Sequence, residues 1–257
     1  MNTAEPSGIP TLTIEGRVAT IRLNRPEVHN RVEPDDLRAL HGLLDQIEAD
    51  AALRVIVLTA GGKSFSSGFH IGKIGAATDG DEDSFATFAD RLERVRLPTI
   101  CALNGGVYGG STDLALACDF RLGVTGAVMF MPAARLGVHY YPGGLQRYVS
   151  RLGVNNAKRL FLTAEKLNAE EMLRIGFLTE LLPPDRLEAR TQELATTLAE
   201  GAPLAVQGMK SALNAIARGD ADLAAIEAAS RASKHSADIK EGRAAWLGKR
   251  PPRFEGR

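Results

Sequence analysis

The sequence has few cysteines and no excess charge of either sign, and both features narrow the class of protein. Cys101 and Cys118 are the only cysteines among 257 residues, and both lie in apolar stretches. A disulfide framework is therefore excluded, and we expect both side chains to be small buried hydrophobic groups. Lysine plus arginine equals aspartate plus glutamate at 31 each. This balance argues against nucleic acid or an acidic membrane as the main partner.

Targeting signals and long apolar segments are missing as well. The N-terminal segment from Met1 to Gly8 lacks the basic and apolar parts of a signal peptide. No apolar run is long enough to span a bilayer. We therefore expect a cytoplasmic protein with no membrane partner. Hydrophobic residues make up 44% of the chain, which is enough for a sizeable core.

Several common catalytic motifs are also absent. Gly62-Lys63-Ser64 resembles the end of a phosphate-binding loop, but Val57 stands where that motif needs its first glycine. The glycines between residues 105 and 110 lack the spacing of a dinucleotide-binding turn, and no G-x-S-x-G elbow occurs. The five histidines lack metal-ligand spacing, and there is no C-x-x-C pair. Composition and spacing alone therefore name no reaction.

Strand-like and helix-like patterns alternate along residues 11–182. We expect a hairpin from residues 11–14 and 18–23, helices over 34–47 and 85–96, buried strands at 55–59, 99–103 and 120–124, an exposed mobile segment at 75–83, a mixed segment at 132–147, and mainly helical chain from Val154 with a strand-like interruption at 177–182. This alternation predicts an α/β core, and the helical remainder predicts an appendage.

A glycine-rich turn follows the expected strand at residues 99–103 and leads into the helix-forming run 113–117. Glycine lets the backbone approach a ligand closely, and the first N–H groups of a helix have no partner within it. These donors lie at the positive end of the helix dipole and suit an anion or a developing oxyanion. Asp113 falls in the first turn, where it either serves chemistry or only complements the dipole.

Four ordered motifs make the chain resemble the enoyl-CoA hydratase/isomerase (crotonase) family over nearly its whole length. They are Asn24-Arg25-Pro26, the segment from Lys63 to Ile71, the turn from Asn104 to Gly110 with its helix, and the segment from Lys249 to Phe254. The resemblance implies a flexible tail (1–10), a crotonase-like spiral of ββα units (11–195), and a helical trimerisation region that closes over coenzyme A (196–257).

The resemblance also implies a reaction centre. The family holds a thioester oxygen, as it becomes an enolate, between two backbone N–H groups, which fall here at Phe69 and Gly110. Hydratases of the family carry two catalytic glutamates, and these positions fall at Asp113 and Ala133. Hydration uses such paired carboxylates to activate water and deliver a proton. The missing carboxylate at Ala133 predicts a protein that is not an efficient hydratase, and an isomerase that relies on it is equally in doubt.

His139, Tyr140 and Tyr141 lie in the segment that faces the acyl group in the family, and we expect them to take over proton transfer. The segment is similar to a decarboxylating branch that acts on methylmalonyl-CoA-like thioesters, in which a tyrosine at the position of Tyr140 contacts the departing carboxylate. That branch has a histidine where Phe69 stands, so the match is partial. Packing or a subunit contact is the other interpretation of the three rings.

Coenzyme A is expected at two groups of residues. Arg25, Ser67, His70 and Ile71 fall at the nucleotide and pantetheine pocket, and Trp246 and Lys249 fall where the C-terminal helix closes over the adenine and phosphates, sometimes from a neighbouring subunit. A lysine suits a phosphate, although a solvated surface lysine is the alternative interpretation. His70 replaces an acidic residue usual at its position, and it either has a new role or only fills space.

The resemblance implies no metal and no cofactor other than coenzyme A, which is part of the substrate. The expected partners are an acyl-CoA thioester and further copies of the chain, as a homotrimer or a dimer of trimers. The expected function is an acyl-CoA-processing lyase or isomerase that uses a thioester enolate. The alternatives are a decarboxylase, a thioester hydrolase and a CoA-binding trimer without turnover.

Overall fold

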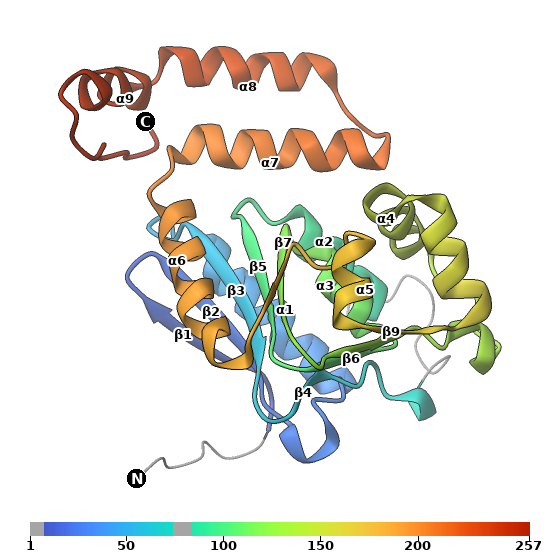
Figure 1. The fold of residues 1–257 in the computed structure, drawn as a ribbon. Helices are drawn as coiled ribbons and strands as arrows, with labels where there is room; N and C mark the ends of the chain where they lie inside the picture. Colours follow the sequence, from blue (N-terminus) through green and yellow to red (C-terminus); the bar gives the residue numbers. More distant parts are fainter. Residues whose placement is uncertain (1–7, 74–83) are drawn as a thin grey trace, which may run out of the picture.

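Two sheets of mostly parallel strands form the centre of the fold (Figure 1). The computed structural model describes residues 8–73 and 84–257. The strands are β1 (Thr11–Glu15), β2 (Val18–Leu23), β3 (Val55–Ala60), β4 (Ser64–Ser66), β5 (Thr99–Leu103), β6 (Gly106–Tyr108), β7 (Phe120–Val124), β8 (Val128–Phe130), β9 (Lys166–Asn168) and β10 (Glu180–Leu182). The larger sheet has the order β1-β2-β3-β5-β7-β10, and the smaller sheet has the order β4-β6-β8-β9. β1–β2 and β8–β9 pair antiparallel, and the other neighbours pair parallel.

Helices cover the sheets and then continue beyond them. They are α1 (Pro34–Ala49), α2 (Phe85–Arg94), α3 (Ser111–Ala117), α4 (Pro142–Thr163), α5 (Ala169–Arg174), α6 (Leu187–Ala199), α7 (Pro203–Arg218), α8 (Leu223–His235) and α9 (Ala237–Leu247), with short 3-10 turns at Pro26–Val28, Ile71–Lys73, Ala133–Leu136 and Pro184–Arg186. α6 packs on β3, β5 and β7, whereas α3 packs on α2 and α4. α7 and α8 lie side by side as a further layer at the top of Figure 1. Within residues 8–73 and 84–257, no helix combines the length and the apolarity that a bilayer crossing requires.

Local sequence explains why these elements form. Strands β3 and β5 lie inside the larger sheet and are almost entirely buried, as expected of parallel strands covered on both faces. Helix α1 instead buries one face, made by Leu37, Leu40, Leu44 and Ile47. Reciprocal bonds between side chains and backbone at Glu33 and Asp36 fix where α1 begins.

The expected hairpin, the helix α1 and the buried strands are confirmed, but the glycine-rich turn is more than a turn. Residues Gly106–Tyr108 form β6, which pairs with β4 and β8. A Cβ at Gly105 would lie 2.2 Å from the carbonyl oxygen of Lys63, so glycine is needed where the two segments meet. The helix then begins at Ser111, with Gly110 as its N-cap residue.

Other expectations need correction. Helix α4 already begins at Pro142, and the helical run expected from Val154 is its second part, because Gly153 interrupts the helix with a φ of 77°. At the end of the expected tail, the Gly8 N–H donates to the carbonyl of Asn24 at 2.7 Å and Pro10 is buried. The expected mobile segment at 75–83 lies outside the described residues.

The domain limits stay a prediction. Helix α6 runs through the expected division between residues 195 and 196, so a boundary there would cut a helix that packs on the larger sheet.

Candidate active site

Two loops meet where the sequence places its backbone donors. Phe69 forms a bridge to Val32, in which the Val32 N–H donates to the Gly68 carbonyl at 2.9 Å and the His70 N–H donates to the Val32 carbonyl at 3.0 Å. The bridge fixes the peptide of Phe69 from both sides. Its own N–H, like that of Gly110, donates to no residue in the described part of the chain.

Gly68 brings the two loops into contact. Its φ is +91°, a conformation that side chains disfavour. A Cβ there would lie 2.6 Å from the Tyr108 carbonyl oxygen and 3.2 Å from the Gly110 nitrogen. The Phe69 and Gly110 peptides therefore belong to adjoining backbone segments, and this arrangement suits a shared oxyanion.

Aromatic rings border this pair of donors. A Cβ on Gly110 would lie 2.8 Å from the Phe85 ring, which begins α2. The rings of Phe69 and Phe85 are 5.9 Å apart between centroids. The surface beside the donors is thus lined on one side by two partly buried aromatic rings.

Asp113 lies one turn further along α3 and is completely buried. Arg147 of α4 donates hydrogen bonds to both of its carboxylate oxygens, with Nε 2.9 Å from Oδ1 and Nη2 2.7 Å from Oδ2. The hydroxyl of Tyr141 also donates to Oδ2. Burial alone would lower the pKa of the Arg147 guanidinium, but the hydrogen bond and charge of Asp113 raise it above its ordinary value. Asp113 and Arg147 therefore form a bidentate ion pair, and both oxygens of the carboxylate already accept hydrogen bonds.

The two tyrosines of the expected proton-transfer segment lie against this carboxylate. Their rings stack at 4.4 Å between centroids. A Cβ on Gly144 would lie 2.3 Å from the Tyr140 ring and 3.1 Å from Oδ2 of Asp113, which places Tyr140 beside the acid. Burial is the largest cause of a pKa well above the ordinary value for both phenols, so both stay protonated donors.

Tyr140 has a donor without an acceptor. Its hydroxyl is buried and makes no hydrogen bond of normal geometry in the described part of the chain, although the Tyr141 hydroxyl is close enough to help raise its pKa. Leaving such a group unpaired costs about 1–3 kcal/mol. The expected third member of the segment lies apart, because His139 is exposed and its Nδ1 is 2.9 Å from the Tyr140 carbonyl oxygen. Ala133 is buried in the neighbouring 3-10 turn and brings no carboxylate.

The expected coenzyme A residues fall into two separated groups. Ser67, His70 and Ile71 follow β4, and Arg25 precedes the neighbouring turn. Three of these side chains already have partners. Arg25 is paired with Asp36 at 3.0 Å, and the Ser67 hydroxyl donates to the carbonyl of Val28 at 3.1 Å. His70 Nδ1 lies 2.9 Å from a carboxylate oxygen of Glu33, whereas Ile71 is 61% exposed. Trp246, which is 85% exposed, and Lys249 lie in and just after α9, at the opposite end of the molecule from β4 (Figure 1). One chain alone does not bring the two groups together.

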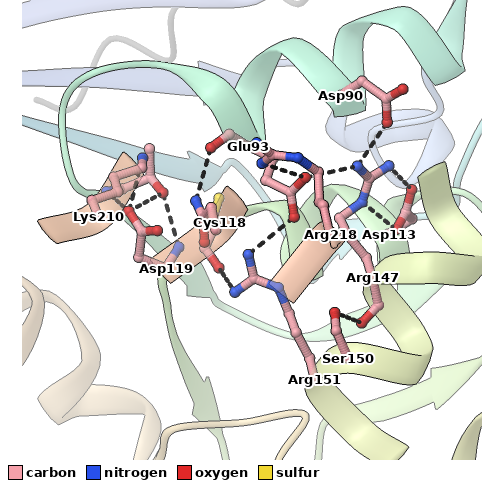
Figure 2. A network of polar contacts seen from close by, with 12 residues as sticks. Asp90, Glu93, Asp113, Cys118, Asp119, Arg147, Ser150, Arg151, Lys210 and Arg218 are labelled. Carbon is pink, nitrogen blue, oxygen red and sulfur yellow. Dashed lines mark hydrogen bonds and ion pairs between the residues drawn. The ribbon is translucent and has the colours of Figure 1, made fainter. Parts of the chain in front are cut away.

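Sequence reasoning missed the residues that hold Asp113. Arg147 lies at the end of a segment that we could describe only as mixed, and nothing in its spacing links it to Asp113, 34 positions earlier. Behind Arg147, Asp90 and Glu93 of α2 complete the cluster (Figure 2). The available signal was the i, i+3 spacing of these two acids on one face of an expected helix.

Comparison with known proteins gives a consistent picture. The family model for enoyl-CoA hydratase/isomerase matches residues 13–257. The chain is 33% identical over 215 residues to a short-chain-enoyl-CoA hydratase of Clostridium acetobutylicum, with 82% of each chain covered. It is 31% identical over 247 residues to a crotonyl-CoA hydratase of Syntrophomonas wolfei, covering 93% of this chain and 95% of that one.

Solved structures agree with this. An enoyl-CoA hydratase from Bacillus anthracis superposes with a TM-score of 0.88 at 30% identity, covering 97% of this chain and 100% of that one. The expected α/β fold of the crotonase type is therefore confirmed.

Proposed function

Because the chain belongs to the enoyl-CoA hydratase/isomerase family, we propose that it acts on acyl-CoA thioesters and stabilises the thioester oxygen as an enolate. The observation that carries the proposal is the pair of adjoining peptides at Phe69 and Gly110, whose N–H groups have no acceptor in the described chain. A thioester gives up an α-proton or an α-carboxylate only when the charge that moves onto its oxygen is stabilised. Each fixed donor contributes roughly 3 kcal/mol to such a transition state.

We propose further that hydration is not the efficient reaction of this protein, although the relatives reported above carry hydratase names. Two features support this. Asp113 already accepts two bonds from Arg147 and one from Tyr141, so it is poorly suited to take a proton from water. Ala133 supplies no second carboxylate. A general base must reach the proton that it abstracts, and neither position meets that requirement.

Decarboxylation is the second candidate, and the buried Tyr140 hydroxyl favours it. A substrate with an α-carboxylate would place an acceptor where this donor has none. The Cα–carboxylate bond would break, CO₂ would leave, and the electron pair would form the enolate held by Phe69 and Gly110. A proton would then add to Cα. This route needs no carboxylate base, which fits the occupied Asp113.

Coenzyme A, in this proposal, binds with its nucleotide and pantetheine beside Arg25, Ser67, His70 and Ile71. Trp246 and Lys249 offer an exposed ring for the adenine and a cation for a phosphate. Because these two lie at the far end of their own chain, a neighbouring copy in a homotrimer or a dimer of trimers would bring them to the pocket.

A thioester panel tests the proposal. Crotonyl-CoA, a 3-enoyl-CoA and methylmalonyl-CoA are incubated with the protein, and products are identified by mass spectrometry. We expect turnover of methylmalonyl-CoA or the 3-enoyl-CoA, and slow hydration of crotonyl-CoA. Release of free coenzyme A would instead indicate thioester hydrolysis. Rapid crotonyl-CoA hydration would show that Asp113 works without a partner carboxylate, and would overturn the second part of the proposal.

Coenzyme A binding is measured in parallel by calorimetry. Tight binding without any turnover would favour the remaining alternative, a CoA-binding trimer without catalysis. Tyr140→Phe distinguishes decarboxylation from isomerisation of a 3-enoyl-CoA. Loss of the hydroxyl should slow decarboxylation and leave isomerisation little changed.

A further inference from the structure

A cluster of ion pairs lies behind Asp113 and joins three helices (Figure 2). We call it the Glu93 cluster, and it consists of Asp90 and Glu93 of α2, Arg147 and Arg151 of α4, and Arg218 of α7. Glu93 is its centre and is 4% exposed. Its Oε1 lies 3.3 Å from Arg151 Nη2, and its Oε2 lies 3.5 Å from both Arg147 Nη1 and Arg218 Nη1.

The cluster determines how Arg147 faces Asp113. A guanidinium is a rigid planar fork with five donors, so fixing one end fixes the other. The Nε and Nη2 edge binds Asp113, and Nη1 is directed to Asp90 at 2.7 Å and to Glu93 at 3.5 Å. Both outer acids lie on one face of α2, so a single helix orients the guanidinium from behind.

Helix α7 also contacts Glu93, through side chains on one of its faces. Lys210, Asn214 and Arg218 lie four residues apart along one face of α7. They contact, in order, the Leu97 carbonyl at 2.6 Å, the Glu93 carbonyl at 3.0 Å and the Glu93 carboxylate at 3.5 Å. A shift of α7 would therefore move the Asn214 amide and the Arg218 guanidinium away from Glu93 or toward it.

We propose that Glu93 is a positioning residue that holds Arg147 against Asp113 and transmits the placement of α7 to that carboxylate. This rests on the proposed function, because Asp113 holds the Tyr141 hydroxyl and lies beside Tyr140, whose hydroxyl that proposal places at the substrate carboxylate. Glu93 itself does not touch the substrate. An ion cluster this buried has a large desolvation cost, and cores of similar volume are often as stable with apolar residues, so stability alone is a weak reason for it.

A double-mutant cycle between Glu93 and Asp113 tests the proposal. Glu93→Gln keeps the size of the side chain and removes its charge. We expect about a 10-fold loss of kcat with KM changed less than about threefold, and less than a twofold further loss when Asp113→Asn is already present, as expected of residues in one network. Arg218→Met, at a partly exposed position, should lower kcat about threefold and should not add to Glu93→Gln.

Glu180→Gln is the matched control, because Glu180 also binds an arginine at two atoms, but this pair joins β10 to Arg190 of α6. It should leave kcat unchanged. Independent, multiplying losses from Glu93→Gln and Asp113→Asn would overturn the proposal, as would a loss of stability in Glu93→Gln without a loss of kcat.

The same cycle is measured on the free energy of unfolding in urea. If the wild-type protein turns over no thioester, the proposed function fails. The coupling is then decided by whether the two unfolding losses add, and full additivity would overturn it.

Discussion

The two halves of the candidate site are built in opposite ways. The loops at Phe69 and Gly110, which we call the backbone half, carry N–H groups that donate to no described residue. In Asp113, by contrast, both carboxylate oxygens accept hydrogen bonds from side chains. Backbone donors depend on the path of the chain and tolerate changes of side chain. The other half, which we call the acid half, consists of Asp113 and depends on the identities of its partners Arg147 and Tyr141. In the proposed function, such a site keeps its backbone donors for an anion while its proton chemistry changes with a few substitutions.

The largest expected effect breaks the acid half. Arg147→Met leaves the Asp113 carboxylate buried without its cation, and we expect a loss of about 3–5 kcal/mol in the free energy of unfolding. Urea denaturation followed by circular dichroism measures it. Adding Asp113→Asn should recover part of the loss, because the uncompensated charge is then gone.

Arg190→Met provides the comparison. Arg190 binds Glu180 at two atoms, each at 2.8 Å, but the pair is about one-third exposed. Its removal should cost less than about 1 kcal/mol. Equal losses at Arg147 and Arg190 would show that the burial of the Asp113 pair has no energetic consequence.

The next effect breaks the backbone half and leaves the acid half intact. In Gly68→Ala the new Cβ meets the Tyr108 carbonyl, so the Phe69 peptide must move. We expect about a 100-fold loss of kcat, the size seen when one oxyanion donor is lost. Steady-state kinetics on the substrate identified from the thioester panel measures it.

Gly126→Ala is the control, since its φ of +82° imposes similar strain but its Cβ would meet nothing within 4 Å. It should cost roughly 1–2 kcal/mol of stability and no activity. Unchanged kcat in Gly68→Ala would remove the backbone half from the mechanism.

The same contrast explains what the sequence predicts well. Local patterns predicted the hairpin, helix α1 and the buried strands, because α1 repeats its apolar residues with the helical period and the buried strands are continuous apolar runs. Ordered motifs singled out Phe69 and Gly110, and the structure brings their backbone segments together at Gly68, whereas their role as donors to a thioester oxygen stays a prediction. These features are recorded in short stretches of neighbouring residues.

The acid half is not recorded locally. Asp113, Arg147 and Glu93 come from three helices, and their contacts depend on how α2, α3 and α4 pack. The grouping of His139 with Tyr140 and Tyr141 followed chain order, but the side chain of His139 is exposed while the tyrosine hydroxyls are buried or bonded. Strand β6 was missed because a three-residue strand between glycines has no period to detect.

The smallest expected effect compares the two stacked tyrosines. Tyr140→Phe removes a buried hydroxyl that has no partner in the described chain, so we expect about 1 kcal/mol of added stability in the absence of substrate. Tyr141→Phe removes the donor to Asp113 and should cost about 1.5–3 kcal/mol, because that bond is to a charged group. Thermal and urea unfolding of both variants measure the two changes, and each variant is the control for the other, since the same atom is lost from adjacent rings. If both variants lowered the free energy of unfolding, the Tyr140 hydroxyl would already have a partner. The argument that it is available to an acceptor on the substrate would then fail.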